Sequence, residues 1–152
     1  MGLTTHGRRI LANALYTRGI NFVGAAVLLQ KHGGDRYVVL HLLCQGIEII
    51  VKALLLFLDY SKYDKLQRKF GHDLEKIIST ALLAYRLRPL RPSLAAEVKI
   101  LNDFYSAHLL RYGGLHDIFG ASIGSGRTFR RVAAVLRLAN RELGRASRLG
   151  AE

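Results

Sequence analysis

The sequence predicts an all-α protein, an antiparallel (up-and-down) bundle of four to five helices. Apolar residues recur at helical spacing in successive segments, and glycines or prolines stand between these segments. No stretch of strand length shows the alternation of apolar and polar residues that is typical of a half-buried strand. With 152 residues, 50% of them hydrophobic, the chain can bury one core, so we expect residues 1–152 to form a single domain.

The first two helices are expected at residues 7–31 and 37–59. Apolar residues of the first lie at spacings compatible with one face, and the sequence Lys-His-Gly-Gly at 31–34 should end it. The second segment is apolar almost all round. It contains the single cysteine, Cys44, for which we expect a buried, unreactive thiol in a reducing compartment.

The middle of the chain is expected to contain a loop and one further helix. Residues 61–71, SKYDKLQRKFG, are polar and basic, which favours a loop. Asp73 can then cap a third helix through LEKIISTALLAY, because its side chain can accept hydrogen bonds from the first free backbone amides. The sequence RLRPLRP at 86–92 should break this helix.

A fourth helix should begin near Pro92 or Ser93 and end at the paired glycines of LLRYGG, residues 109–114. The glycine-rich sequence GASIGSG then precedes a last amphipathic helix at 127–148. This last segment contains seven arginines and one acid. Six of the arginines gather within about a quarter of the helix circumference; they are Arg127, Arg130, Arg137, Arg141, Arg145 and Arg148.

The excess of positive charge indicates an anionic partner. The chain has 23 Lys and Arg against 11 Asp and Glu, a net charge of +12, which is typical of nucleic-acid-binding domains. The arginine ridge at 127–148 could follow a phosphate backbone or be an ordinary solvated face. Arginine alone, without lysine, favours phosphate because its planar guanidinium binds phosphate oxygens in pairs.

Four polar residues form a stripe along the second helix: His41, Gln45, Glu48 and Lys52. Their spacing of four, three and four places them on one side, since each helical residue turns by about 100°. Glu48 and Lys52, one turn apart, can form an ion pair along a cleft, because buried charges are costly unless paired. The alternative is that both side chains face solvent at the edge of the bundle.

Two segments, HLLCQGIEIIVKALLLF at 41–57 and GHDLEKII at 71–78, resemble the HEPN (higher eukaryotes and prokaryotes nucleotide-binding) domain family. The helix order is similar over residues 8–145. The resemblance implies a helical bundle that binds RNA or a nucleotide and forms a homodimer, sometimes beside a nucleotidyltransferase or an antitoxin. Expected binding residues are Glu48, Lys52, Tyr112, Arg127, Arg130, Arg137, Arg141 and Arg145.

Many HEPN domains carry an arginine followed after four to six residues by a histidine, and act as metal-independent endoribonucleases in toxin or defence systems. The sequence RYGGLH, from Arg111 to His116, fits this spacing, although Tyr112 stands where a small polar residue is common and two glycines interrupt the helix. His116 would take a proton from the ribose 2′-hydroxyl and Arg111 would stabilise the phosphate charge. The alternatives are an ordinary helix end at LLRYGG and a non-catalytic dimerisation or binding module.

A phosphohydrolase of the helical HD type is a further alternative. Such enzymes bind a metal ion through a histidine, a His-Asp pair and a distant aspartate, and the chain offers His41, His72 with Asp73, and Asp103 or Asp117. A third class is a purely structural interaction protein, without nucleic-acid affinity or turnover.

No cofactor or metal ion is expected under the HEPN hypothesis. GASIGSGRT lacks the Gly-Lys-Ser/Thr ending of a phosphate-binding P-loop, and one cysteine gives no zinc pattern. The amino-terminal sequence has no apolar run of signal-peptide length before Arg18. Residues 37–58 approach membrane-spanning length, but the charges of Glu48 and Lys52 near the middle favour a bundle helix. We therefore expect a soluble, cytoplasmic protein.

Overall fold

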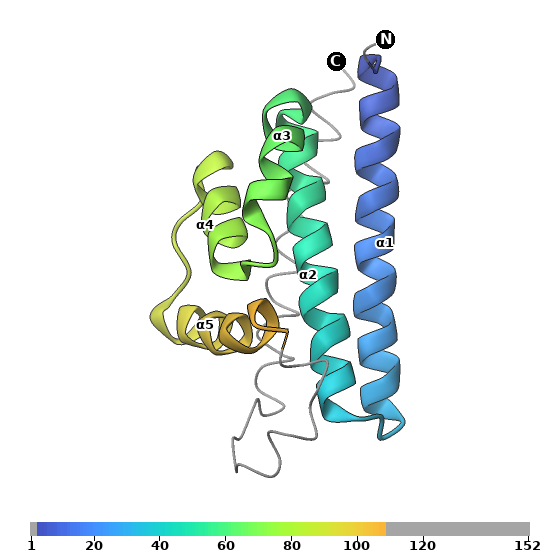
Figure 1. The fold of residues 1–152 in the computed structure, drawn as a ribbon, viewed down its shortest axis with the longest axis vertical. Coiled ribbons are helices and arrows are strands. Elements are labelled where there is room, and N and C mark those ends of the chain that lie inside the picture. Colours follow the sequence, from blue (N-terminus) through green and yellow to red (C-terminus); the bar gives the residue numbers. More distant parts are fainter. Residues whose placement is uncertain (1–2, 109–152) are drawn as a thin grey trace.

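The structure, a computed structural model, describes residues 3–108, and every regular element in this part of the chain is an α-helix. The all-α class is therefore confirmed for these residues. The helices are α1 (Thr5–Lys31), α2 (Arg36–Leu58), α3 (Tyr60–Phe70), α4 (Leu74–Ala84) and α5 (Pro92–Ser106). The long helices α1 and α2 run in opposite directions beside each other, and α4 and α5 lie on the other side of α2 (Figure 1).

The central element is α2, which contacts each of the other four described helices. Its length and composition would allow it to cross a membrane, but 67% of its most apolar stretch is buried inside the protein. Leu43, Cys44, Ile50 and Leu55 are among its most deeply buried side chains. The apolar character of α2 is therefore used in packing on several sides, as expected for a bundle helix.

Two glycines allow α1 and α2 to approach closely. A Cβ atom on Gly19 would lie 2.6 Å from Ile50 Cγ1, and one on Gly46 would lie 2.6 Å from Val23 Cγ2, both much closer than real carbon contacts. The fully buried residues of α1 are small and lie seven apart: Ala12, Gly19 and Ala26. Small residues at this spacing form a strip along which the backbone of α2 packs directly.

Side-chain caps define where α1 and α2 begin. The Thr4 hydroxyl accepts a hydrogen bond from the amide of Gly7, and the Asp35 carboxylate accepts from the amides of Tyr37 and Val38. The turn between the helices uses Gly33 with a φ of 72°, a conformation that glycine adopts without strain. The expected stop at residues 31–34 is confirmed.

The expectation of a loop at 61–71 is wrong, because residues 60–70 form α3. Asp59 ends α2 and also caps α3, where its carboxylate accepts a hydrogen bond from the amide of Lys62. Tyr63 and Phe70 are buried against the core, and Leu66 is partly buried beside them. The spacing of three and four between these residues is helical, but the basic residues around them hid it.

The start of α4 and of α5 agrees with the sequence analysis. Asp73 caps α4 by accepting a hydrogen bond from the amide of Lys76, and Pro92 occupies the first turn of α5. The expected end of the fourth helix at the glycines of 109–114 is wrong, because α5 ends at Ser106. The Ser106 hydroxyl donates back to the Asn102 carbonyl at 2.6 Å, and His108 has a positive φ of 59°, which ends the helical path.

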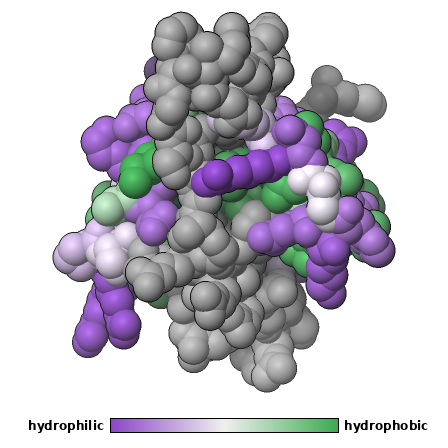
Figure 2. Space-filling model, turned by 90° about the horizontal axis from the view of Figure 1, so that it is seen from below, coloured by the Kyte–Doolittle hydropathy of each residue, from purple (hydrophilic) through white to green (hydrophobic). Residues whose placement is uncertain are grey.

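The outer sides of α1 remain apolar and exposed. Its large exposed apolar residues are Ile10, Leu11, Val27, Leu28 and Leu29, with Ile10 at 55% and Leu28 at 59% exposure. At the end of the molecule that carries the turn between α1 and α2, hydrophobic side chains lie between strongly hydrophilic ones (Figure 2). Within residues 3–108, α1 is thus the helix that leaves the most apolar surface uncovered.

Candidate functional site

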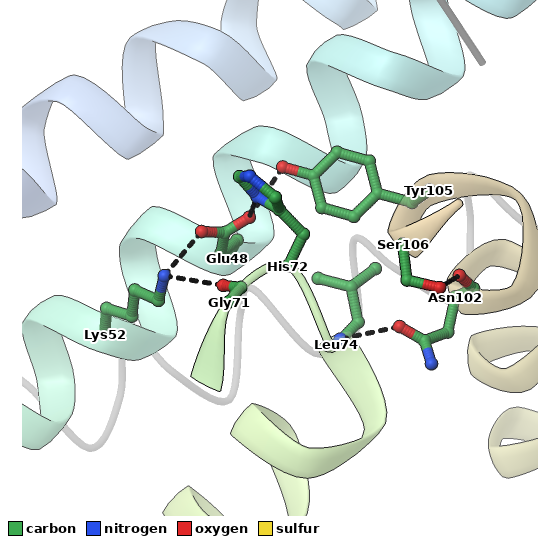
Figure 3. A network of polar contacts seen from close by, with 8 residues as sticks. All are labelled: Glu48, Lys52, Gly71, His72, Leu74, Asn102, Tyr105 and Ser106. Atoms are coloured by element: carbon green, nitrogen blue, oxygen red, sulfur yellow. Dashed lines mark hydrogen bonds and ion pairs between the residues drawn. The ribbon is translucent and has the colours of Figure 1, made fainter. Parts of the chain in front are cut away.

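A buried carboxylate, Glu48 of α2, is the centre of a polar network. Glu48 is only 6% exposed. Its Oε1 accepts a hydrogen bond from Lys52 Nζ at 2.6 Å, and its Oε2 accepts from the Tyr105 hydroxyl at 2.6 Å and from His72 Nδ1 at 2.9 Å (Figure 3). The network joins α2, the turn before α4, and α5. A carboxylate with donors on both oxygens is held in one orientation.

The network keeps Glu48 ionised. Burial alone would raise the pKa of Glu48, because it disfavours the charged form. The hydrogen bonds from Lys52, Tyr105 and His72, together with the positive charge of Lys52, outweigh burial and lower the pKa below its ordinary value. Glu48 is therefore a carboxylate at neutral pH.

The ion pair between Glu48 and Lys52, expected from their spacing, is present. Both side chains are largely buried, with exposures of 8% and 15%. Lys52 Nζ also donates to the carbonyl oxygen of Gly71 at 2.9 Å. Since Gly71 follows α3 directly, this bond holds the turn between α3 and α4 against α2, and with it the adjacent His72.

Aromatic rings surround the carboxylate. The ring of Tyr105 lies 5.6 Å from the ring of His41 and 5.6 Å from that of His72, measured between centroids. His108, just after α5, lies 5.3 Å from His72 with the two rings nearly perpendicular. His41 and His72 therefore flank the ring of Tyr105, and His108 lies against His72. His41 was expected on the polar stripe of α2, whereas Tyr105 and His108 were not predicted as site residues.

The tautomer of His72 follows from its hydrogen-bond partner. An ionised carboxylate can only accept hydrogen bonds, so Nδ1 of His72 must carry the proton that points at Glu48. In the neutral ring the lone pair is then on Nε2. The side chain of His72 is 45% exposed, so this ring is accessible while its carboxylate partner is buried.

Asn102 of α5 fixes the start of α4, which follows the turn that carries His72. It is 7% exposed, and its Oδ1 accepts a hydrogen bond from the Leu74 amide at 2.7 Å. Its Nδ2 donates to Asp73 Oδ1 at 3.3 Å and to Glu75 Oε2 at 3.2 Å. Nothing in the local sequence indicated this role, because the contacts join Asn102 to residues that stand 27 to 29 positions earlier in the chain.

The helix α3 places exposed positive charge beside the site. Its exposed cations are Lys62, Lys65, Arg68 and Lys69, and the last two lie in its final turn, four and three residues before His72. The positive charge of this segment was evident in the sequence, but its helical form was not. As a helix, it carries these cations on its exposed side, and its last turn lies next to the turn that carries His72.

The metal-binding alternative finds no support among residues 3–108. No group of three or more His, Cys, Asp or Glu side chains in this range could hold a metal ion. Of the expected ligands, Asp73 caps α4, and Asp103 is exposed and paired with Lys99 at 3.1 Å. His41 lies beside Tyr105. Asp117 lies outside the described residues.

Cys44 is the buried thiol that the sequence predicted. It is fully buried in α2, and burial together with the negative charge of Glu48 raises its pKa to about 12. A thiol of this kind is neither a nucleophile nor a metal ligand at neutral pH.

The remaining predicted site residues lie outside the described residues. They are Arg111, Tyr112, His116, Arg127, Arg130, Arg137, Arg141 and Arg145. Of the predicted set, the structure describes Glu48 and Lys52, and it brings these two together.

Comparison of the chain with models of protein families, with curated proteins and with solved structures found no match.

Proposed function

We propose that this chain is a HEPN-like helical domain that binds RNA or a nucleotide. The observation that carries the proposal is the contact between the two segments on which the resemblance depends, residues 41–57 and 71–78. Glu48 of the first segment binds His72 of the second, and Lys52 binds the carbonyl of Gly71. Segments that are separate in sequence thus contribute to one site, as a shared family motif would require.

The same proposal covers the finer architecture. Residues 1–152 form one domain, an antiparallel HEPN-like bundle of four to five main helices, with the arginine-rich segment at 127–148 as its last amphipathic helix. We also propose that the protein is cytoplasmic and forms a homodimer. A nucleotidyltransferase or an antitoxin is the partner that the resemblance suggests.

An anionic ligand is supported by charge. Arg68 and Lys69 in the last turn of α3 are exposed and lie next to the turn that carries His72. The arginines at 127, 130, 137, 141 and 145 add further positive charge to the sequence. Positive charge attracts a phosphate backbone, and the exposed imidazole rings of His72 and His108 lie beside it. RNA is the class of partner that fits both the positive charge and the exposed rings.

Cleavage of RNA by Arg111 and His116 is the activity that the resemblance adds. Both residues lie outside the described residues, so this part of the proposal depends on the resemblance and on the chemistry of an arginine and a histidine beside a phosphodiester. A non-catalytic dimerisation or RNA-binding module is the alternative, and it needs only the basic surface.

Salt dependence of RNA binding tests the proposal. The affinity of the unmodified protein for single-stranded RNA should fall steeply with salt, because binding releases counterions. The double variant K65Q/R68Q, and separately the triple variant R137Q/R141Q/R145Q, should make the logarithmic slope shallower by about 0.7 for each phosphate that the variant no longer neutralises.

The matched control is R18Q/K31Q, which removes two exposed cations of α1 outside the network. The control should leave the slope nearly unchanged, since these cations do not lie at the proposed surface. Equal changes in the control and in K65Q/R68Q would reduce the effect to overall charge and contradict an RNA site beside α3. Absence of RNA binding by the unmodified protein would overturn the proposed function.

A further inference from the structure

His72 combines a buried partner with an accessible ring. Its Nδ1 is hydrogen-bonded to the ionised carboxylate of Glu48 at 2.9 Å, while the side chain is 45% exposed. A histidine held in this way keeps the lone pair of its neutral ring on Nε2, and that atom makes no hydrogen bond to another residue in the range 3–108. A carboxylate that orients a histidine is the arrangement by which proteins prepare an imidazole to accept a proton.

A second histidine lies beside the first. The ring centroids of His72 and His108 are 5.3 Å apart, and His108 is exposed. This separation lets both rings contact a single phosphodiester. One neutral and one protonated imidazole next to a phosphodiester can supply the base and the acid of its cleavage without a metal ion.

We propose that His72 and His108 are the general base and general acid of a metal-independent RNA cleavage reaction. This inference rests on the proposed RNA binding and assigns the chemistry to described residues rather than to Arg111 and His116. Glu48 and Tyr105 are positioning residues, because they hold His72 through hydrogen bonds and ring contact.

The reaction balances without a co-reactant. His72 Nε2 takes the proton of a ribose 2′-hydroxyl, and the 2′-oxygen forms a bond to phosphorus. The bond between phosphorus and the 5′-oxygen breaks, and this oxygen takes a proton from the His108 imidazolium. The products are a 2′,3′-cyclic phosphate and a free 5′-hydroxyl, and proton exchange with water restores both histidines.

Neighbouring charges suit these roles. The groups facing His72 are Glu48 and Lys52 on α2, and Tyr105 and His108 on or after α5, while Asp73 follows it in the chain and caps α4. His41 of α2 faces Tyr105 on its other side. Lys52 is committed to Glu48 and to the Gly71 carbonyl, so it balances the buried carboxylate and is not the proton acceptor.

Two substrates separate the base from the acid. A mixed-sequence RNA oligonucleotide needs both, because its leaving 5′-oxygen must be protonated. Uridine 3′-(4-nitrophenyl phosphate) needs only the base, because nitrophenolate leaves without a proton. With excess chelator present, H72Q should slow both reactions about 100-fold or more. H108Q should slow RNA cleavage by a similar factor but change turnover of the nitrophenyl ester less than about threefold.

Controls make the result specific. H32Q, an identical change at an exposed histidine after α1, should leave both rates unchanged, and its preparation measures any contaminating nuclease. The pH profile of RNA cleavage should be bell-shaped, whereas the profile for the nitrophenyl ester should keep only the acidic limb, because its leaving group needs no acid. Circular dichroism of H72Q and H108Q should match that of the unmodified protein.

Several results would overturn the inference. It fails if H72Q keeps the rates of the unmodified protein, if activity is lost only in R111A and H116A, or if the unmodified protein turns over neither substrate. RNA binding is measured on the same preparations. A protein that binds RNA with the expected salt slope but fails these tests retains the proposed function and loses only the assignment of His72 and His108.

Discussion

Gly19 of α1 and Gly46 of α2 lie against each other so closely that a Cβ atom on either would be 3.0 Å from the carbonyl oxygen of the other. This reciprocal contact lets the two longest helices pack backbone to backbone. It sets the position of α2 and therefore of Glu48, which follows Gly46 by two residues. The geometry of the polar network thus depends on two residues that have no side chain.

Alanine at either glycine should destabilise the protein. G19A and G46A add a methyl group where only backbone and a branched side chain are available, and such overpacking costs about 1–3 kcal/mol. G24A is the matched control, because a Cβ on Gly24 meets nothing within 4 Å. It should be neutral or stabilising by up to about 1 kcal/mol, since alanine favours a helix. Urea unfolding curves would measure all three, and equal effects would contradict the close packing.

The Glu48–Lys52 pair should show strong coupling in a double-mutant cycle. E48Q or K52M alone leaves one charge without its main partner in a largely buried site, which costs about 3 kcal/mol. The double variant removes both charges and should lose less than the sum of the single changes. Urea unfolding at pH 7 would provide the free energies. Small and additive effects would indicate that solvent screens both groups.

Acid should weaken the protein partly through Glu48. Its pKa is lowered in the folded state, where burial opposes ionisation but hydrogen bonds from Lys52, Tyr105 and His72 prevail. The unfolded chain therefore binds a proton at higher pH than the folded protein does. The stabilisation is present above the ordinary glutamate pKa of about 4.3 and is lost as pH falls through the folded value.

The measurement is the free energy of unfolding between pH 7 and pH 3 for the unmodified protein and E48Q. The unmodified protein should lose more stability over the acidic part of this range, so the two curves should converge at low pH. Parallel curves would show that Glu48 does not contribute to the acid dependence.

A homodimer is expected from the exposed surface of α1 as well as from the resemblance. The apolar helix α2 does not supply this surface, because 67% of its most apolar stretch is buried within one chain. The exposed apolar side chains lie on α1 instead, including Ile10 and Leu28. Sedimentation at micromolar concentration should show about twice the 17.0 kDa mass of one chain, and I10E or L28E should shift it towards monomer if α1 forms the interface. A monomer of the unmodified protein would refute the prediction.

Local signals allowed much of the fold to be predicted. The glycines after α1, the Asp73 cap and the proline at the start of α5 act on neighbouring backbone, so they can be recognised from a few residues. The ion pair of Glu48 and Lys52 also follows from spacing within one helix. The helix α3 was missed because its apolar positions are few and its cations dominate the composition.

The rest of the site depends on contacts that spacing does not encode. Tyr105 reaches Glu48 across 57 residues of sequence, and Asn102 reaches the Leu74 amide across 28. Neither residue stands out in its own segment, where each shares the buried face of an ordinary amphipathic helix. The approach of His72 to His108 likewise arises only when α4 and α5 pack together.

The position of Asp59 between α2 and α3 determines where the chain can accept an insertion. Asp59 is both the C-cap of α2 and the N-cap of α3, so no other residue separates the two helices. An insertion there would rotate α3 relative to α2 and displace the turn that carries His72. The segment between α4 and α5, residues 85–91, has no such constraint at its exposed positions, of which Arg88 and Pro89 are two. A tag or a fluorescent label is therefore best introduced between α4 and α5, where a change of length leaves the contact of α2 with α3 at Asp59 intact.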